Sequence, residues 1–330
     1  MRVVLIGVAH WHTPFYLDPC LALPGVMVAG VSDPDPVRAA LVAARAGCPA
    51  FTDPRAMLAA TRPDFAFVLG RHCDMAADAR LLLDAGIPFA VEKPGATSAA
   101  EAWALAERAA AAGRFAAVPF VFRNSALPGA IRDAAPGEAL HVASFRFIGG
   151  LVDRYRAEGC EWMLSRATAG GGALLNLGIH FLDLCRVLLP GASLRVTAAS
   201  RSNATAGLDI EDYATVLLEG GGARCQVETG YLYPAPHSVF DLHYSLRTER
   251  HFFAVRDAHA LEISDDGRGR RMLAMPTINA PLYPEFVADT LRRAASGQAP
   301  LADLTDLAEA VALVEAAYAL APLPPARSAP

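Results

Sequence analysis

The sequence predicts two domains: an α/β domain with a doubly wound parallel sheet over residues 1–122, and an α+β domain with a large, open, mostly antiparallel sheet over residues 123–330. Three observations predict this class. The chain has 330 residues, about twice the usual domain length of roughly 150. Short apolar runs alternate with helical patterns in the first third, as in a parallel sheet. Farther along, strand-like runs follow one another with only turn residues between them.

The first domain is predicted from continuous apolar runs, which are typical of strands buried on both faces. Five such runs occur, at residues 3–6, 26–31, 65–69, 88–91 and 115–118. Helical patterns separate them at residues 36–45, 74–85 and 98–112. Gly86 closes the second of these helices. Ser98, with Glu101 three residues later, predicts a capping box at the start of the third.

The second domain begins with a predicted strand at 140–148 and a helix at 173–188, whose apolar residues recur at three- and four-residue spacing. Six strands follow, at residues 194–201, 213–218, 224–231, 239–247, 251–255 and 261–263. We expect the two last helices, 285–295 and 304–319, to pack back on the first domain. Too few helices remain to cover both faces of the sheet, so we expect a homodimer or homotetramer assembled through it.

Composition excludes several classes of protein. The net charge is −5 with a pI near 6.0, so no basic surface for nucleic acid is indicated. The hydrophobic fraction of 53% supports a folded core rather than disorder. Polar and charged residues interrupt the apolar region 173–189, which argues against a membrane span. Six scattered cysteines form no C-x-x-C pair and no signal peptide is evident, so we expect a cytoplasmic protein without a structural metal.

The turn after the first strand resembles a glycine fingerprint in part. In G-x-G-x-x-G, the glycines allow a tight turn, a close approach of the backbone to a pyrophosphate, and helix–strand packing. Gly7 matches the first position, Ala9 is the smallest substitute at the second, and His12 departs from the third. The segment therefore indicates either a dinucleotide-binding turn or an ordinary strand–helix connection.

Asp33 strengthens the dinucleotide interpretation because it ends the second strand. A carboxylate at that position can accept hydrogen bonds from the adenosine ribose of NAD and would repel the 2′-phosphate of NADP. The alternative is that residues 33–36 form only a turn and a helix start. The two roles are compatible.

Two further motifs carry candidate chemistry. Glu92-Lys93-Pro94 follows a strand whose carboxyl end faces the ligand crevice of such a sheet, although a Glu-Lys pair is also common on surfaces. Residues 170–172 are three glycines that open a helix carrying Asn176 and His180, four residues apart and therefore on one helical face. That pair is either an acid/base site or a buried structural pair.

In this order, the motifs resemble the glucose–fructose oxidoreductase / inositol dehydrogenase / rhizopine catabolism (Gfo/Idh/MocA) oxidoreductase family over essentially the whole chain. The resemblance implies a Rossmann-type first domain that binds NAD, with NADP the less favoured cofactor. It implies hydride transfer between that cofactor and a secondary alcohol or ketone of a sugar, cyclitol or related polyol.

The resemblance also implies roles for individual residues. Lys93 matches the active-site lysine and His180 the catalytic histidine, while Asn176 stands where many members carry an aspartate. His180 would then remove the hydroxyl proton as Lys93 stabilises the developing alkoxide. The expected cofactor-binding residues are Gly7, Ala9, His10, Trp11, His12, Asp33, Gly70, Arg71, Glu92 and Lys93. The expected substrate-binding residues are Arg123, Trp162, Asn176 and His180, and the wider crevice is expected to include Phe122, Arg154 and Tyr155.

Departures from the family pattern keep a second function open. Besides Ala9 and His12, the segment 69–75 lacks the usual proline and the histidine after it. Asn176 cannot carry a proton, although it can orient a substrate by hydrogen bonds. The alternative is therefore a sensor or regulatory protein of the same fold that binds a dinucleotide without turnover. His10-x-His12 would also suit a metal-dependent β/α-barrel hydrolase, which the antiparallel run after residue 194 contradicts.

Overall fold

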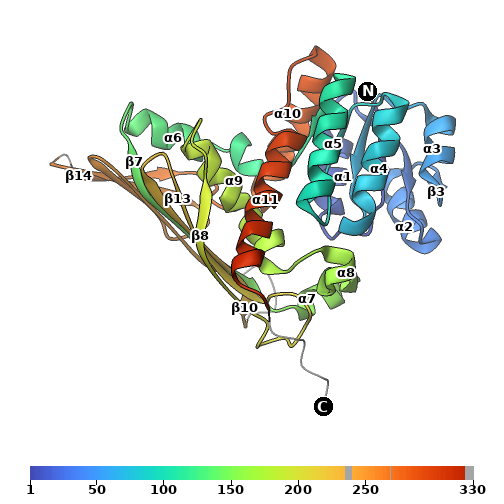
Figure 1. Ribbon diagram of the computed structural model, residues 1–330. Helices are drawn as coiled ribbons and strands as arrows, with labels where there is room; N and C mark the ends of the chain where they lie inside the picture. The colour runs from blue at the N-terminus through green and yellow to red at the C-terminus, as the bar shows by residue number, and fades with distance from the viewer. Residues whose placement is uncertain (235–239, 268, 324–330) are drawn as a thin grey trace.

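The apolar runs of the first third assemble into one six-stranded parallel sheet in the computed structural model, which describes residues 1–234, 240–267 and 269–323 (Figure 1). The strand order is β3-β2-β1-β4-β5-β6, that of a doubly wound Rossmann domain. The strands are β1 (Arg2–Ile6), β2 (Met27–Ser32), β3 (Ala50–Phe51), β4 (Phe65–Val68), β5 (Phe89–Val91) and β6 (Ala116–Ala117). The predicted fold class of this domain is confirmed.

Helices cover both faces of this sheet: α1 (Thr13–Ala22), α2 (Pro36–Ala46), α3 (Pro54–Thr61), α4 (His72–Ala85) and α5 (Ala99–Ala112). Their ends follow local chemistry. Gly86 closes α4 in the left-handed conformation, as predicted. The Ser98 hydroxyl accepts the Glu101 N–H, but the Glu101 carboxylate accepts from Thr97 rather than from Ser98, so only half of the predicted capping box forms.

The second sheet has eight strands in the order β14-β13-β12-β11-β7-β10-β9-β8. All neighbours are antiparallel except β7 and β10. The strands are β7 (Leu140–Gly150), β8 (Arg195–Ser202), β9 (Tyr213–Gly220), β10 (Ala223–Tyr233), β11 (Asp241–Thr248), β12 (His251–Val255), β13 (Ala260–Asp265) and β14 (Gly269–Ala274). The mostly antiparallel sheet is confirmed; β14 was not predicted, and residue 239 of the predicted strand 239–247 lies outside the described residues.

Short helices join the two sheets. They are η1 (Val121–Asn124), α6 (Leu127–Ala134), α7 (Asp153–Ala157), η2 (Glu161–Leu164) and α8 (Arg166–Ala169). The predicted helix 173–188 begins with a π-helical segment, η3 (Leu174–Gly178), and continues as α9 (Ile179–Leu188). The π turn contains Asn176 and changes the spacing between this residue and His180; such segments are frequent at functional sites.

The chain ends by returning to the first domain. After η4 (Ala280–Leu282), α10 (Tyr283–Ser296) packs against α1, and α11 (Leu304–Leu320) lies beside α5 (Figure 1). The Glu315 carboxylate accepts the Ala99 N–H at 2.8 Å, and Val118 N–H donates to the Ala302 carbonyl. Although residues 123–330 were assigned to the second domain by chain order, these helices contact the first.

One helical stretch of the described chain, Arg166–Leu188, is long and apolar enough to span a membrane by length and composition. It is 83% buried inside the protein, where it packs against the large sheet as a core helix does. Its burial explains the apolar composition without a membrane.

Helices α6 and α9 lie on one face of the large sheet (Figure 1). The opposite face carries no helix among the described residues. Val142, Leu217 and Phe252 are exposed on outward positions of β7, β9 and β12. We therefore expect a dimer or tetramer through this face, measured by light scattering at micromolar concentration.

Leu217→Arg should shift the protein toward monomer because it places a charge on that apolar face. Leu41→Arg is the matched control, since Leu41 is exposed on α2 in the other domain. A monomeric wild-type protein at micromolar concentration contradicts this expectation.

Candidate active site and cofactor groove

Gly7 makes the tight turn that follows β1. Its φ is +64°, and a Cβ on it would lie 2.6 Å from the Gly70 Cα. Its N–H donates to the Ser32 carbonyl at 2.7 Å. Only glycine avoids both the strain and the clash, so the ends of β1 and β4 can lie side by side.

Asp33 fixes the same turn. One carboxylate oxygen accepts the Val8 N–H at 2.7 Å and the other accepts the Asp35 N–H at 2.9 Å. The turn role anticipated from the sequence is therefore present. Each carboxylate oxygen retains acceptor capacity, because a carboxylate offers about four lone-pair positions.

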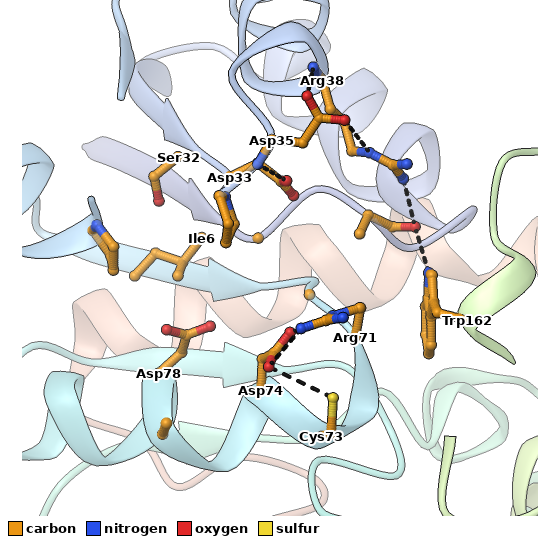
Figure 2. Close-up of a pocket in the computed structure, with 16 residues that line it drawn as sticks. Ile6, Ser32, Asp33, Asp35, Arg38, Arg71, Cys73, Asp74, Asp78 and Trp162 are labelled. Atoms are coloured by element: carbon orange, nitrogen blue, oxygen red, sulfur yellow. Dashed lines mark hydrogen bonds and ion pairs between the residues drawn. The ribbon is translucent and has the colours of Figure 1, made fainter. Parts of the chain in front are cut away.

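A groove of about 640 Å³ opens at the carboxyl ends of β1, β2 and β4, where a doubly wound sheet binds its ligands (Figure 2). Figure 2 shows Asp33, Asp35 and Arg38 on one side, Arg71, Asp74 and Asp78 on the other, and Trp162 at one end. The lining residues are Ile6, Gly7, Ala9, Ser32, Asp33, Pro34, Asp35, Arg38, Pro54, Gly70, Arg71, Cys73, Asp74, Ala77, Asp78 and Trp162. Five predicted cofactor residues line it: Gly7, Ala9, Asp33, Gly70 and Arg71.

The groove fits a dinucleotide in two observed respects. The close Gly7–Gly70 approach leaves a cradle that a Cβ would fill. The Ser32 hydroxyl, which is buried and lines the groove, has no hydrogen-bond partner among the described residues. Trp162, predicted to bind substrate, instead lies at the groove and donates its indole N–H to the Ala9 carbonyl at 3.2 Å.

The other predicted cofactor residues gather in a buried cluster beside the groove. His12, at the third glycine position, points toward Glu92: its Nδ1 lies 3.2 Å from the Glu92 Oε2 and 3.0 Å from the Tyr283 hydroxyl. Tyr16 also donates to that Glu92 oxygen, at 2.5 Å. Tyr16 and Tyr283 were not predicted as site residues, because neither belongs to a motif.

His10, His12 and Glu92 each place one possible metal-ligand atom within 4.8 Å of the others. The His10 Nδ1 accepts the His12 backbone N–H at 3.0 Å, and two tyrosines donate to Glu92. Hydrogen bonds therefore already use the Nδ1 atoms of both histidines and the Glu92 carboxylate, although both Nε2 atoms lack a partner among the described residues, and we propose no metal site here.

Lys93 connects the two domains. Its ammonium, buried at 1% exposure, donates to the Asn176 carbonyl at 2.8 Å and to the Asn176 Oδ1 at 2.7 Å. The Asn176 amide then donates to the hydroxyls of Tyr155 and Tyr231. Burial lowers the pKa of Lys93 to about 8; Glu92 opposes this shift and Arg154 adds to it. One ammonium proton remains for a ligand.

His180 lies in the same buried region at 4% exposure, and the rings of Phe120 and Phe122 are each 6.3 Å away. Neither ring nitrogen has a hydrogen-bond partner among the described residues. Burial, aided by the Lys93 charge, lowers the pKa of His180 well below its ordinary value. The imidazole is therefore neutral at pH 7 and can accept a proton.

The three glycines at 170–172 position this helix. A Cβ on Gly172 would lie 1.9 Å from the Glu211 carbonyl oxygen, so only glycine lets the chain pass. The buried Glu211 carboxylate accepts the Leu174 N–H at 3.0 Å and the Tyr318 hydroxyl at 2.7 Å. These contacts tie the start of η3 to α11.

Arg123 does not join the cluster. Its guanidinium forms ion pairs with Asp183, at 2.6 and 2.9 Å, and with Asp306 at 2.8 Å. Those bonds connect α9 to α11 and use the donors that the predicted substrate role would need. The structure thus gives Arg123 a structural role.

His72 was not singled out from the sequence, where segment 69–75 showed only a departure from the family pattern. Its Nδ1 lies 2.8 Å from the Ala169 carbonyl, and its ring is 4.9 Å from that of Trp162. Burial lowers the pKa of His72 to about 3. Its ring is also 5.9 Å from that of His10, so His72 contacts both Trp162 at the groove and the buried cluster.

Comparison with known proteins identifies the class. Residues 1–120 match the oxidoreductase family with an NAD-binding Rossmann fold, and residues 130–250 match the GFO/IDH/MocA C-terminal domain. The chain belongs to the Gfo/Idh/MocA oxidoreductase family, a family of NAD(P)-dependent oxidoreductases. This confirms the resemblance drawn from the sequence motifs. No curated protein matches the chain.

Solved structures share the fold over nearly the whole chain. An oxidoreductase from Agrobacterium radiobacter, in complex with NAD+, L-tartaric acid and magnesium, is 22% identical with a TM-score of 0.84, covering 97% of this chain and 95% of its own. An inositol dehydrogenase homolog from Azotobacter vinelandii, complexed with NAD+, is 20% identical (TM-score 0.82; coverage 96% and 94%). A 3-ketoreductase from Actinomadura kijaniata, with NADP and TDP-benzene, is 19% identical (TM-score 0.80; coverage 98% of both).

The buried histidines make a prediction about acid stability. Burial lowers the pKa of His10, His12, His72 and His180, whereas an unfolded histidine binds a proton below about pH 6.5. Below that pH the unfolded state binds more protons than the folded state. The free energy of unfolding is therefore highest above about pH 6.5 and falls on acidification, by up to about 1.4 kcal/mol per pH unit for each histidine.

The urea concentration at the unfolding midpoint should fall as the pH is lowered from 7.5 to 5.5. His72→Gln should reduce that slope, whereas His259→Gln, at an exposed position between β12 and β13, should not. Midpoints that stay constant over this interval would contradict the prediction.

Proposed function

We propose that this protein transfers a hydride between NAD and a secondary alcohol or ketone of a sugar, cyclitol or related polyol. The observation that carries the proposal is the buried set of Lys93, Asn176 and His180. Two ammonium protons of Lys93 are bound by Asn176, and both nitrogens of His180 lack a partner among the described residues. A cation with one free donor and a neutral base are what alcohol oxidation requires.

Each residue of this set has a separate role in the proposed reaction. His180 accepts the proton of the substrate hydroxyl, and Lys93 donates a hydrogen bond to the same oxygen and stabilises its developing negative charge. Asn176 fixes the ammonium, and the hydroxyls of Tyr155 and Tyr231 fix Asn176. Gly7, Asp33 and Ser32 would hold the cofactor, which supplies the hydride acceptor when bound.

The comparisons support the substrate class without defining the substrate. One similar structure is an inositol dehydrogenase homolog and another is a 3-ketoreductase. The similar structures include complexes with NAD+ and with NADP, so they do not favour either cofactor. The proposed preference of this chain for NAD therefore rests on Asp33 alone.

Cofactor fluorescence gives the first test, in which NADH and NADPH are titrated before a panel of polyols, inositols and aldoses. We expect turnover of at least one class. Binding of NADH with no turnover of any polyol would favour the sensor alternative over the dehydrogenase.

Lys93→Met should leave NADH binding nearly intact and reduce turnover by about 10²-fold or more, because it removes one transition-state donor. His180→Ala should reduce turnover by roughly 10²–10⁴-fold and flatten the acid limb of the rate–pH profile. Asn176→Asp, which restores the carboxylate common in the family, should keep or raise activity on neutral polyols. Steady-state kinetics and NADH titration of each variant measure these effects.

The protonation of Lys93 can be measured directly, because Lys93 is the only lysine in the sequence. A single ε-carbon resonance in ¹³C-lysine-labelled protein therefore reports its protonation, and we expect a midpoint near pH 8. A Lys93→Met enzyme as active as wild type would eliminate the catalytic assignment.

NADH should bind more tightly than NADPH by about 5- to 150-fold, since a carboxylate facing a 2′-phosphate costs on the order of 1–3 kcal/mol. Asp33→Asn keeps an acceptor for the turn but removes the charge, so the preference should shrink in that variant. Paired fluorescence titrations measure both constants. NADPH binding that equals or exceeds NADH binding refutes the predicted preference.

A further inference from the structure

Arg154, on α7, forms no ion pair with any charged side chain among the described residues. Its guanidinium carbon lies 4.6 Å from the centre of the Tyr155 ring, 5.6 Å from that of Tyr231 and 6.0 Å from that of Trp11. It donates to the Tyr155 hydroxyl at 2.6 Å. Its Nε is buried without a hydrogen-bond partner, and no carboxylate of the described residues forms an ion pair with it.

Three other part-buried arginines of the second domain have carboxylate partners. Arg123 and Arg186 are paired with Asp183 and Asp306, and Arg201 lies 3.7 Å from the Glu211 carboxylate. Arg154 is half-buried as a whole, but its Nε is fully buried, and a buried donor left unpaired is costly. The aromatic stack around Arg154 holds its planar group in one orientation, which suits a partner supplied from outside the chain.

Hydrogen bonds connect Arg154 to the reacting groups. The Tyr155 hydroxyl accepts from Arg154 and from the Asn176 amide, and Asn176 in turn accepts from Lys93. One bound molecule can therefore contact Lys93 and Arg154 together if it carries a hydroxyl and an acceptor a few bonds apart.

The charges of this region are unbalanced. Lys93 and Arg154 contribute two positive charges, whereas Glu92 is the carboxylate nearest to Lys93, at 4.0 Å, and is also held by Tyr16 and Tyr283. Asn176 is an amide and adds no negative charge. Among the described residues, one positive charge is left without a counterpart, which matches a monoanion.

We propose that the substrate is a hydroxy acid, such as an aldonate or a uronate, whose carboxylate binds the Arg154 guanidinium while its secondary hydroxyl meets Lys93 and His180. This inference rests on the proposed function and narrows its substrate from polyols in general to their carboxylates. The guanidinium fork matches a carboxylate in bidentate geometry. A phosphate ester would bring up to two negative charges against the one left uncompensated.

The experiment compares substrates that differ only in the acid group. With NAD+ as cofactor, kcat/KM is measured for D-gluconate against D-sorbitol, for D-glucuronate against D-glucose, and for D-sorbitol 6-phosphate as the phosphate probe. We expect each acid to exceed its neutral counterpart by about 30-fold or more, as for a buried charge pair. The Lys93 ε-carbon resonance of the NADH complex should shift with the acids and not with the neutral compounds.

Arg154→Met replaces the guanidinium group with an uncharged, apolar side chain. It should therefore raise KM for the acids by about 30-fold or more, with a smaller change in kcat. NADH binding should stay as in wild type, because Arg154 does not line the cofactor groove. The loss for the neutral probes should be much smaller than the loss for the acids. Arg154→Lys should restore part of the affinity, since it keeps the charge but loses the fork. Arg156→Met is the control, because Arg156 is exposed and pairs with Asp153.

Failure of this inference is distinguishable from failure of the proposed function. Neutral polyols oxidised as well as the acids, preference for the phosphate, or acid kinetics unaffected by Arg154→Met would overturn the inference and leave the dehydrogenase intact. Acid binding that depends on Arg154 but gives no turnover would support the inference and overturn the proposed function. If NADH binds but no probe is turned over and no probe shifts the Lys93 resonance, both the inference and the proposed function are overturned.

Discussion

The contact between the Lys93 ammonium and Asn176 is the interaction on which the rest of the site depends. Lys93 follows β5 of the first domain, and Asn176 lies in η3 of the second, so this pair fixes how the two domains meet. An ammonium buried to this degree needs hydrogen-bond acceptors. Two Asn176 oxygens supply them, and the tyrosines behind Asn176 hold the amide in the orientation that presents its oxygen.

The altered glycine turn is compensated from the far end of the chain. A histidine at the third glycine position would crowd an ordinary dinucleotide fold, yet His12 turns toward Glu92 and the Tyr283 hydroxyl. Tyr283 begins α10, the helix that returns to pack against α1. The unusual His10-Trp11-His12 turn and the returning helix are therefore two parts of one arrangement, in which imidazoles fill space near the site without adding charge.

Arg123 and Arg154 show why residue type does not define a site. Both are arginines of the second domain that the sequence placed in the crevice. Arg123 meets Asp183 and Asp306, which neutralise it and make it a connection between α9 and α11. Arg154 meets aromatic faces and no carboxylate of the described residues. The difference lies in their neighbours, which come from elements far apart in the sequence.

The sequence by itself determined the fold class, because apolar periodicity and turn residues are local properties. It also determined Gly7, Lys93 and His180 as candidates, since motifs carry them. Only the tertiary structure decided that Asp33 also accepts the Val8 N–H of the turn after β1, that Arg123 is structural, and that Tyr16, Tyr283, Tyr155 and Tyr231 support the cluster. Those roles arise from contacts between distant segments, and burial, which sets the protonation of the histidines and of Lys93, exists only once both domains have closed around them.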